Sequence, residues 1–138
     1  MITQTLDYSD GDTELEGYLA FQETDVQKPL VLVSHDWSGR RDFACKAAER
    51  MAELGYVGFA LDMYGKGVFG GDSDTEKNAA LMGPFAEDRN LLRQRITAAL
   101  TAGRNVPQVD PKRVAAIGYC FGGMCVLELA RSGADILG

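Results

Sequence analysis

Histidine is nearly absent from this sequence, which has one, His35, and only three cysteines, Cys45, Cys120 and Cys125. A structural zinc ion needs about four cysteine or histidine ligands, and the cysteines have no CxxC spacing, so the sequence predicts no metal site. An odd number of cysteines is also unlike the disulfide framework of a small secreted protein. We therefore expect free thiols and no metal.

Long apolar runs and an excess of basic residues are lacking as well. The apolar runs are only as long as a strand, and residues 1–5 lack the basic and apolar regions of a secretory signal, so we expect a cytoplasmic protein without a membrane span. Lys and Arg number 14 against 20 Asp and Glu, which gives a net charge of −6. This balance disfavours a nucleic-acid surface, and the expected partner is a small molecule.

The composition is that of one globular domain, with 46% apolar and 25% charged residues. Strand and helix patterns alternate along the sequence. Residues 2–8 and 14–21 partly alternate between apolar and polar and are joined by Ser-Asp-Gly-Asp, which predicts an antiparallel hairpin. The continuous apolar run over 30–34 predicts a strand buried on both faces of a parallel sheet.

A helix is predicted to begin at Asp42 and to stop at Gly55. Its apolar residues recur at helical spacing: Phe43, Ala47, Met51 and Leu54. Residues 56–61 predict the next strand, so this part of the chain has the pattern of a right-handed βαβ unit.

A polar loop over 62–74 leads to the second half of the chain. We expect a short helix over 75–82, and a second helix that begins at Pro84 and ends at Gly103. A further strand is predicted over 113–117.

The loop contains a misleading motif, because residues 65–70 spell G-x-G-x-x-G. That fingerprint binds dinucleotides when its glycines open a helix whose N-terminus holds the pyrophosphate. Here Gly-Asp-Ser-Asp follows, which predicts more loop and more negative charge. We therefore expect no cofactor.

The stretch G-Y-C-F-G-G at 118–123 lies between an apolar run and a helix pattern. It predicts a strand, a sharp turn and a helix, with Cys120 at the turn. A nucleophile on such a turn is held at positive φ, and glycines two residues before and after it relieve the crowding. The alternative is that the glycines only end a strand and open a turn, and that Cys120 is a small buried hydrophobe. Cys45 and Cys125 lie within predicted helices and are candidates for packing.

Three motifs together resemble the dienelactone hydrolase family of the α/β-hydrolase fold. They are H-D-W-S-G at 35–39, G-Y-V-G-F-A-L-D-M-Y-G at 55–65 and G-Y-C-F-G-G at 118–123. The resemblance runs the whole length and implies an α/β fold, an α/β-hydrolase-type mostly parallel sheet with helices on both faces. In that family a Cys-His-Asp triad opens esters or lactones through an acyl-enzyme, which implies that Cys120 is the nucleophile.

The resemblance also implies an oxyanion hole and a partner for the thiol. In the family an acidic residue after the first buried strand interacts with the resting thiol, and Asp36 occupies that position. The backbone N–H groups of Trp37 and Phe121 occupy the positions of the two oxyanion donors. The alternative for Asp36 is an ordinary loop acid that hydrogen-bonds nearby backbone.

The chain departs from the family after the turn at Cys120. On this fold the acid and the histidine of the triad follow the nucleophile, yet no histidine follows Cys120, and Asp135 follows it too closely to be the triad acid. We therefore expect residues 1–138 to be a single, incomplete α/β-hydrolase domain, truncated after the elbow helix and essentially inactive alone. The alternative is a non-catalytic α/β module that self-associates.

In both cases we expect strand 113–117 to form an open sheet edge, available for a homodimer or for association with a missing C-terminal fragment. Candidate anchors for a substrate carboxylate are Arg40, Arg41, Lys77, Arg89 and Arg93.

Overall fold

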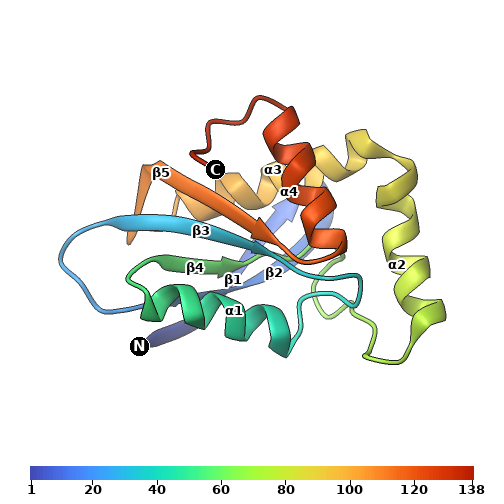
Figure 1. Cartoon of the computed structure of the whole chain (residues 1–138), viewed down its shortest axis with the longest axis horizontal. Helices are drawn as coiled ribbons and strands as arrows, with labels where there is room; N and C mark the ends of the chain where they lie inside the picture. Colours follow the sequence, from blue (N-terminus) through green and yellow to red (C-terminus); the bar gives the residue numbers. More distant parts are fainter.

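A mixed five-stranded sheet runs through the centre of the protein, in the order β1-β2-β4-β3-β5 (Figure 1). The computed structural model describes all residues, 1–138. Its strands are β1 (Ile2–Asp10), β2 (Thr13–Phe21), β3 (Lys28–Ser34), β4 (Val57–Ala60) and β5 (Val109–Gly118). Its helices are α1 (Asp42–Glu53), α2 (Thr75–Glu87), α3 (Arg89–Arg104) and α4 (Phe121–Arg131). None of them combines the length and the apolar character that a membrane crossing requires.

The predicted hairpin and the three later strands are confirmed. β1 and β2 pair antiparallel along their whole length, and β2 joins β4 antiparallel. β4, β3 and β5 are parallel to one another, with β3 in the middle. Residues Leu30 to Ser34 of β3 are all buried, because helices cover both faces of this part of the sheet.

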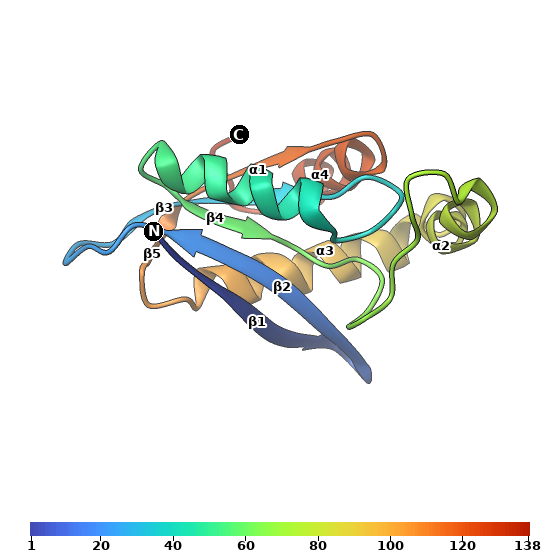
Figure 2. The same cartoon turned by 90° about the horizontal axis from the view of Figure 1, so that it is seen from below.

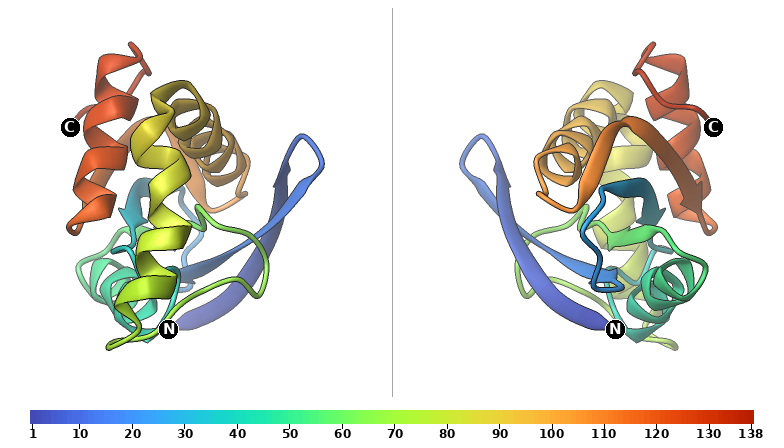
Figure 3. Two further views of the ribbon diagram at one scale, coloured as in Figure 1. Left: turned by 90° about the vertical axis from the view of Figure 1, so that its right-hand side faces the viewer. Right: turned by 90° about the vertical axis from the view of Figure 1, so that its left-hand side faces the viewer.

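The helices form a layer on each side of the strands. In Figure 1, α1 lies below the strands, and α3 and α4 lie above them. The larger core lies between the sheet and α3 and α4, and it includes Phe59, Leu92, Ile96 and Leu129. α2 stands beyond the carboxyl ends of the parallel strands (Figure 3). This is the α/β architecture that the sequence predicts.

The apolar stripe of the α1 sequence is not the face that the structure buries most deeply. The structure buries Ala44, Ala48 and Ala52, whereas Phe43 is 56% and Leu54 is 54% exposed. A Cβ atom on Gly58 of β4 would lie only 2.1 Å from the Ala48 carbonyl oxygen, so the helix backbone packs directly on the strand. Only small side chains fit there, and close packing therefore selects the alanine face over the more hydrophobic one.

The boundary between α2 and α3 also differs from the prediction. α2 continues through Pro84 to Glu87, and α3 begins at Arg89. The carboxylate of Asp88 accepts hydrogen bonds from the N–H groups of Asn90 and Leu91, at 3.1 Å each. A side-chain cap of this kind satisfies donors that the start of a helix leaves free, so the new helix begins after Asp88 and not at Pro84.

A buried ion pair joins the N-terminal hairpin to α3. Arg95 Nε donates to Asp10 Oδ2 at 2.8 Å, with side chains that are 9% and 8% exposed. Arg95 Nη1 also donates to the carbonyl oxygen of Met63 at 2.7 Å, and its guanidinium lies 5.3 Å from the centre of the Phe85 ring. Figure 2 shows the hairpin beside α3. One arginine thus connects the hairpin, the loop after β4 and α2.

β5 lies at one edge of the sheet, as predicted, with β3 as its only neighbouring strand. Part of this edge is occupied, because the N–H of Leu137 donates to the Val114 carbonyl at 2.7 Å and the N–H of Ala116 donates to the Gly138 carbonyl at 2.9 Å. The last residues of the chain therefore run beside β5.

Candidate active site

Cys120 stands on a sharp turn between the end of β5 and the start of α4. Its φ of 56° makes it the only non-glycine residue with positive φ. A Cβ atom on Gly118 would lie 2.1 Å from the Gly122 carbonyl oxygen, and one on Gly122 would lie 2.1 Å from the Ser34 carbonyl oxygen. Because no side chain fits at either position, both glycines are required for the turn, and its shape is that of a nucleophile elbow.

The three cysteines have different surroundings. Cys120 is exposed, Cys45 is half-buried and Cys125 is buried. Burial raises the pKa of the Cys125 thiol to about 12 and, to a smaller extent, the pKa of the Cys45 thiol. Cys120 is therefore the accessible thiol, and its role as a nucleophile stays a prediction.

The loop after β3 lies directly against this turn. The Tyr119 N–H donates to the Ser34 carbonyl at 3.2 Å. The Trp37 N–H donates no hydrogen bond within the chain. The Phe121 N–H is the first of α4 and has no intrahelical acceptor, as for the first four N–H groups of any helix. The two predicted oxyanion donors are thus unpaired groups, one on the loop after β3 and one at the start of α4, and their role in binding an oxyanion stays a prediction.

Asp36 makes its hydrogen bonds within its own loop. Its Oδ1 accepts from the Ser38 N–H at 2.8 Å and from the Ser38 hydroxyl at 2.5 Å, which is a common arrangement for an aspartate in a turn. No hydrogen bond joins Asp36 to Cys120. The structure therefore places Asp36 beside the turn as a loop-ordering acid, and its interaction with the thiol stays a prediction.

His35 is fully buried and both of its ring nitrogens are engaged. Nε2 lies 3.0 Å from the Met63 N–H, which can only donate, so Nε2 is the acceptor and Nδ1 carries the proton. Nδ1 then donates to the Asp36 carbonyl at 2.6 Å. Burial lowers the pKa of His35. The only histidine of the chain is therefore a neutral group that orders the loop, and neither nitrogen is available as a base.

Tyr64 also belongs to this site, although the sequence analysis did not single it out. Its hydroxyl donates to the Trp37 carbonyl at 2.8 Å, and its ring lies nearly parallel to that of Phe121, with centroids 5.8 Å apart. Burial raises the pKa of Tyr64, so the hydroxyl keeps its proton. The signal in the sequence was its place in the D-M-Y-G segment that follows β4.

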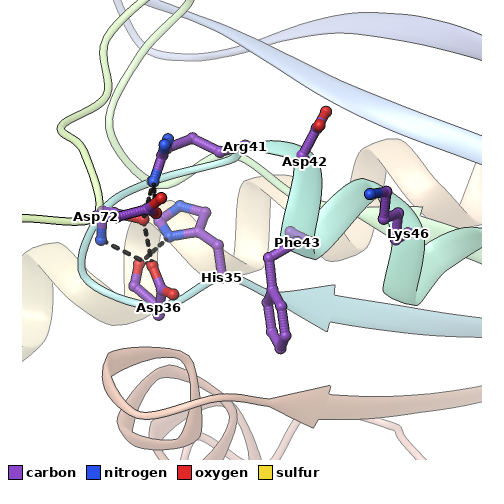
Figure 4. Close-up of a pocket in the computed structure, with 10 residues that line it drawn as sticks. His35, Asp36, Arg41, Asp42, Phe43, Lys46 and Asp72 are labelled. Atoms are coloured by element: carbon purple, nitrogen blue, oxygen red, sulfur yellow. Dashed lines mark hydrogen bonds and ion pairs between the residues drawn. The ribbon is translucent and has the colours of Figure 1, made fainter.

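An open pocket of about 360 Å³ lies between this loop and the start of α1. Figure 4 shows Asp36 and Arg41 on its rim, with Arg41 held by Asp72; the ion pair is 2.7 Å long. Among the five candidate anchors, only Arg41 lines this pocket. Arg40 pairs with Glu16, and Arg89 and Arg93 pair with Glu128, so the structure does not bring the five together.

Comparison with known proteins gives the same result as the fold. The model of the dienelactone hydrolase family matches residues 15–137. A carboxymethylenebutenolidase from a Pseudomonas species is 31% identical over 111 residues, which are 76% of this chain and 45% of that protein. An esterase of Vibrio cholerae is 29% identical over 137 residues, which are 94% of this chain and 28% of that protein. The chain therefore spans less than half the length of these curated relatives.

Solved structures extend this likeness to three dimensions. A dienelactone hydrolase-like promiscuous phosphotriesterase from metagenomic libraries has a TM-score of 0.93 and 37% identity, covering 98% of this chain and 56% of that one. A dienelactone hydrolase from Anabaena variabilis, at 20% identity, has a TM-score of 0.71 over 98% of this chain and 60% of that one, which shows a shared fold. From the family match over most of its length and from these structures, we conclude that the chain belongs to the dienelactone hydrolase family, with the α/β-hydrolase fold.

Proposed function

We propose that the protein hydrolyses a small ester or lactone through an acyl-enzyme on Cys120. The observation that carries this proposal is the position of the thiol, exposed on a turn at φ 56° at the N-terminus of α4. The relatives of the chain include a carboxymethylenebutenolidase and an esterase, which supports ester or lactone substrates.

In the proposed reaction the Cys120 thiolate attacks the carbonyl carbon of the substrate and forms a sulfur–carbon bond. The carbonyl oxygen becomes an oxyanion, which accepts hydrogen bonds from the N–H groups of Trp37 and Phe121; each such donor is worth about 100-fold or more in rate. The ester carbon–oxygen bond then breaks, and the departing oxygen takes a proton from water. Water cleaves the thioester in a second step and restores the thiol.

We further propose that residues 1–138 are one part of a hydrolase domain whose triad acid and histidine lie outside them. The short coverage of the relatives supports this, as does the engagement of both nitrogens of His35. Without a base for water, this chain should be acylated once and should not turn over. Its three free cysteines agree with the cytoplasmic location that we also propose.

The test is pre-steady-state acylation with p-nitrophenyl acetate, followed by peptide mapping. We expect release of one equivalent of nitrophenol, an acetyl group on the Cys120 peptide, and little release afterwards. Cys120→Ala should abolish the burst, and the matched control Cys45→Ala should retain it. A burst that survives Cys120→Ala, or acetylation of Cys125 instead, would show that the assignment is wrong.

A second candidate function is a non-catalytic module that binds through its sheet edge. One observation favours it: β5 has a strand on one side only, next to an apolar groove lined by Leu30, Tyr56, Val114 and Leu137. Acylation of Cys120 would argue against this candidate, because a module selected only for binding needs no reactive thiol.

A further inference from the structure

The peptide that carries the Trp37 N–H is held by two side chains that the proposed reaction does not itself use. We propose that His35 and Tyr64 are positioning residues that aim this N–H at the oxyanion. This inference rests on the proposed function, since it concerns the same site. His35, the only histidine in the chain, thus positions a hydrogen-bond donor and does not act as a base.

The first step concerns the peptide bond between Asp36 and Trp37. A trans peptide is planar, with its C=O and N–H pointing in opposite directions, so fixing the carbonyl oxygen also fixes the N–H. The Asp36 carbonyl accepts a hydrogen bond from His35 Nδ1 at 2.6 Å and another from the Gly39 N–H at 3.2 Å. Both donors lie on the side opposite to the Trp37 N–H, which consequently points away from them without an acceptor in the chain.

The second step concerns the next peptide, between Trp37 and Ser38. Its carbonyl accepts from the Tyr64 hydroxyl at 2.8 Å, and its N–H donates to Asp36 Oδ1 at 2.8 Å. The peptide planes on both sides of the Trp37 Cα are therefore fixed, and the first one cannot flip without breaking the bond to His35. A free N–H with a fixed direction needs no reorganisation when negative charge develops in front of it.

The same two side chains link this donor to the other one. His35 and Tyr64 have ring centroids 5.0 Å apart, and the Tyr64 ring lies nearly parallel to the ring of Phe121, at 5.8 Å. His35 Nε2 is in turn held by the Met63 N–H. The residues just after β4 thus support both the loop after β3 and the first residue of α4, so they set the spacing between the two N–H groups.

The experiment compares two reactions of the same thiol. Acylation of Cys120 by p-nitrophenyl acetate builds an oxyanion, whereas alkylation by iodoacetamide displaces iodide from a saturated carbon and builds none. Tyr64→Phe removes only the hydroxyl and should slow acylation about tenfold, the usual weight of one hydrogen bond. His35→Leu should slow it about 100-fold, as for loss of one oxyanion donor. His35→Asn, which has the shape of leucine and keeps an N–H near the position of Nδ1, should recover most of that loss.

Alkylation should stay within about twofold of the wild-type rate in every variant, because a thiol on an intact turn is all that it requires. Tyr18→Phe, which removes a hydroxyl bonded to Glu49 away from the site, is the matched control and should change neither rate. Parallel loss of both reactions, or unchanged acylation in Tyr64→Phe, would overturn the positioning role. If the buried His35 variants do not fold, Tyr64→Phe decides alone. Wild-type protein that is alkylated but never acylated at Cys120 would overturn the proposed function itself.

Discussion

The stability of this protein should fall between pH 7 and pH 5 because of a single residue, His35. Its side chain is fully buried, and burial lowers its pKa below the usual value of about 6.5. The unfolded chain therefore binds a proton at a pH where the folded chain does not, so the contribution of His35 is complete above about pH 6.5 and is lost as the pH falls. The loss from pH 7 to pH 5 is at most about 2 kcal/mol, the value for a histidine that takes up no proton in the folded state over this range.

The carboxylates with lowered pKa values change the free energy of unfolding at a lower pH than His35 does. Asp10, Asp110 and Glu128 have lowered pKa values, so the stability that they contribute is present above the unfolded pKa and is lost only below about pH 5.

Urea denaturation at pH 7, 6 and 5 measures the free energy of unfolding. His35→Asn, which cannot titrate, should remove the decrease. An NMR titration adds a direct check, because the one histidine signal should titrate below pH 6.5 in the folded protein. A titration near pH 6.5, or a free energy that is flat from pH 7 to pH 5, would refute the reasoning.

Two further predictions concern the ion pair and the sheet edge. Arg95→Ala leaves the Asp10 carboxylate with only its hydrogen bond from Gln94 Nε2 and should lower the free energy of unfolding by about 3 kcal/mol. Arg50→Ala, which removes an exposed pair, should change it by under about 1 kcal/mol, and equal effects in urea denaturation would contradict this. The chain should associate through β5 by displacing residues 137 and 138, which pair with Val114 and Ala116 at this edge, so light scattering should show a dimer that becomes monomeric in Ala115→Lys, a charge on the edge strand. A wild-type monomer would contradict this expectation.

The sequence was informative where a local constraint decides the structure. The spacing of Gly118 and Gly122 around Cys120 predicted the turn, because the approach of two backbones leaves no room for a Cβ atom at either glycine. It was misleading for α1, where the more hydrophobic face of Phe43 and Leu54 is exposed. That choice depends on how closely the helix approaches β4, a distance that the helix sequence does not contain.

The candidate site was also predictable only where a local motif marks it. Cys120 and the loop at Asp36 and Trp37 could be found from local motifs next to predicted strands. The bond between the Tyr64 hydroxyl and the Trp37 carbonyl joins residues 27 positions apart across two loops. Such a contact follows from the order of β3 and β4 in the sheet and from the path of both loops, so it had to be seen in three dimensions.

The central place of β3 has a consequence during synthesis of the chain. β3 pairs with β4 on one side and with β5 on the other, and about 80 residues separate β3 from its partners in β5, or roughly 4–16 s at about 5–20 residues per second on the ribosome. During those seconds a mostly apolar strand has one unpaired edge, which can bind another nascent chain. A chaperone that covers residues 30–34 until β5 emerges would therefore raise the yield of folded protein, and slower translation after β4 would lower it.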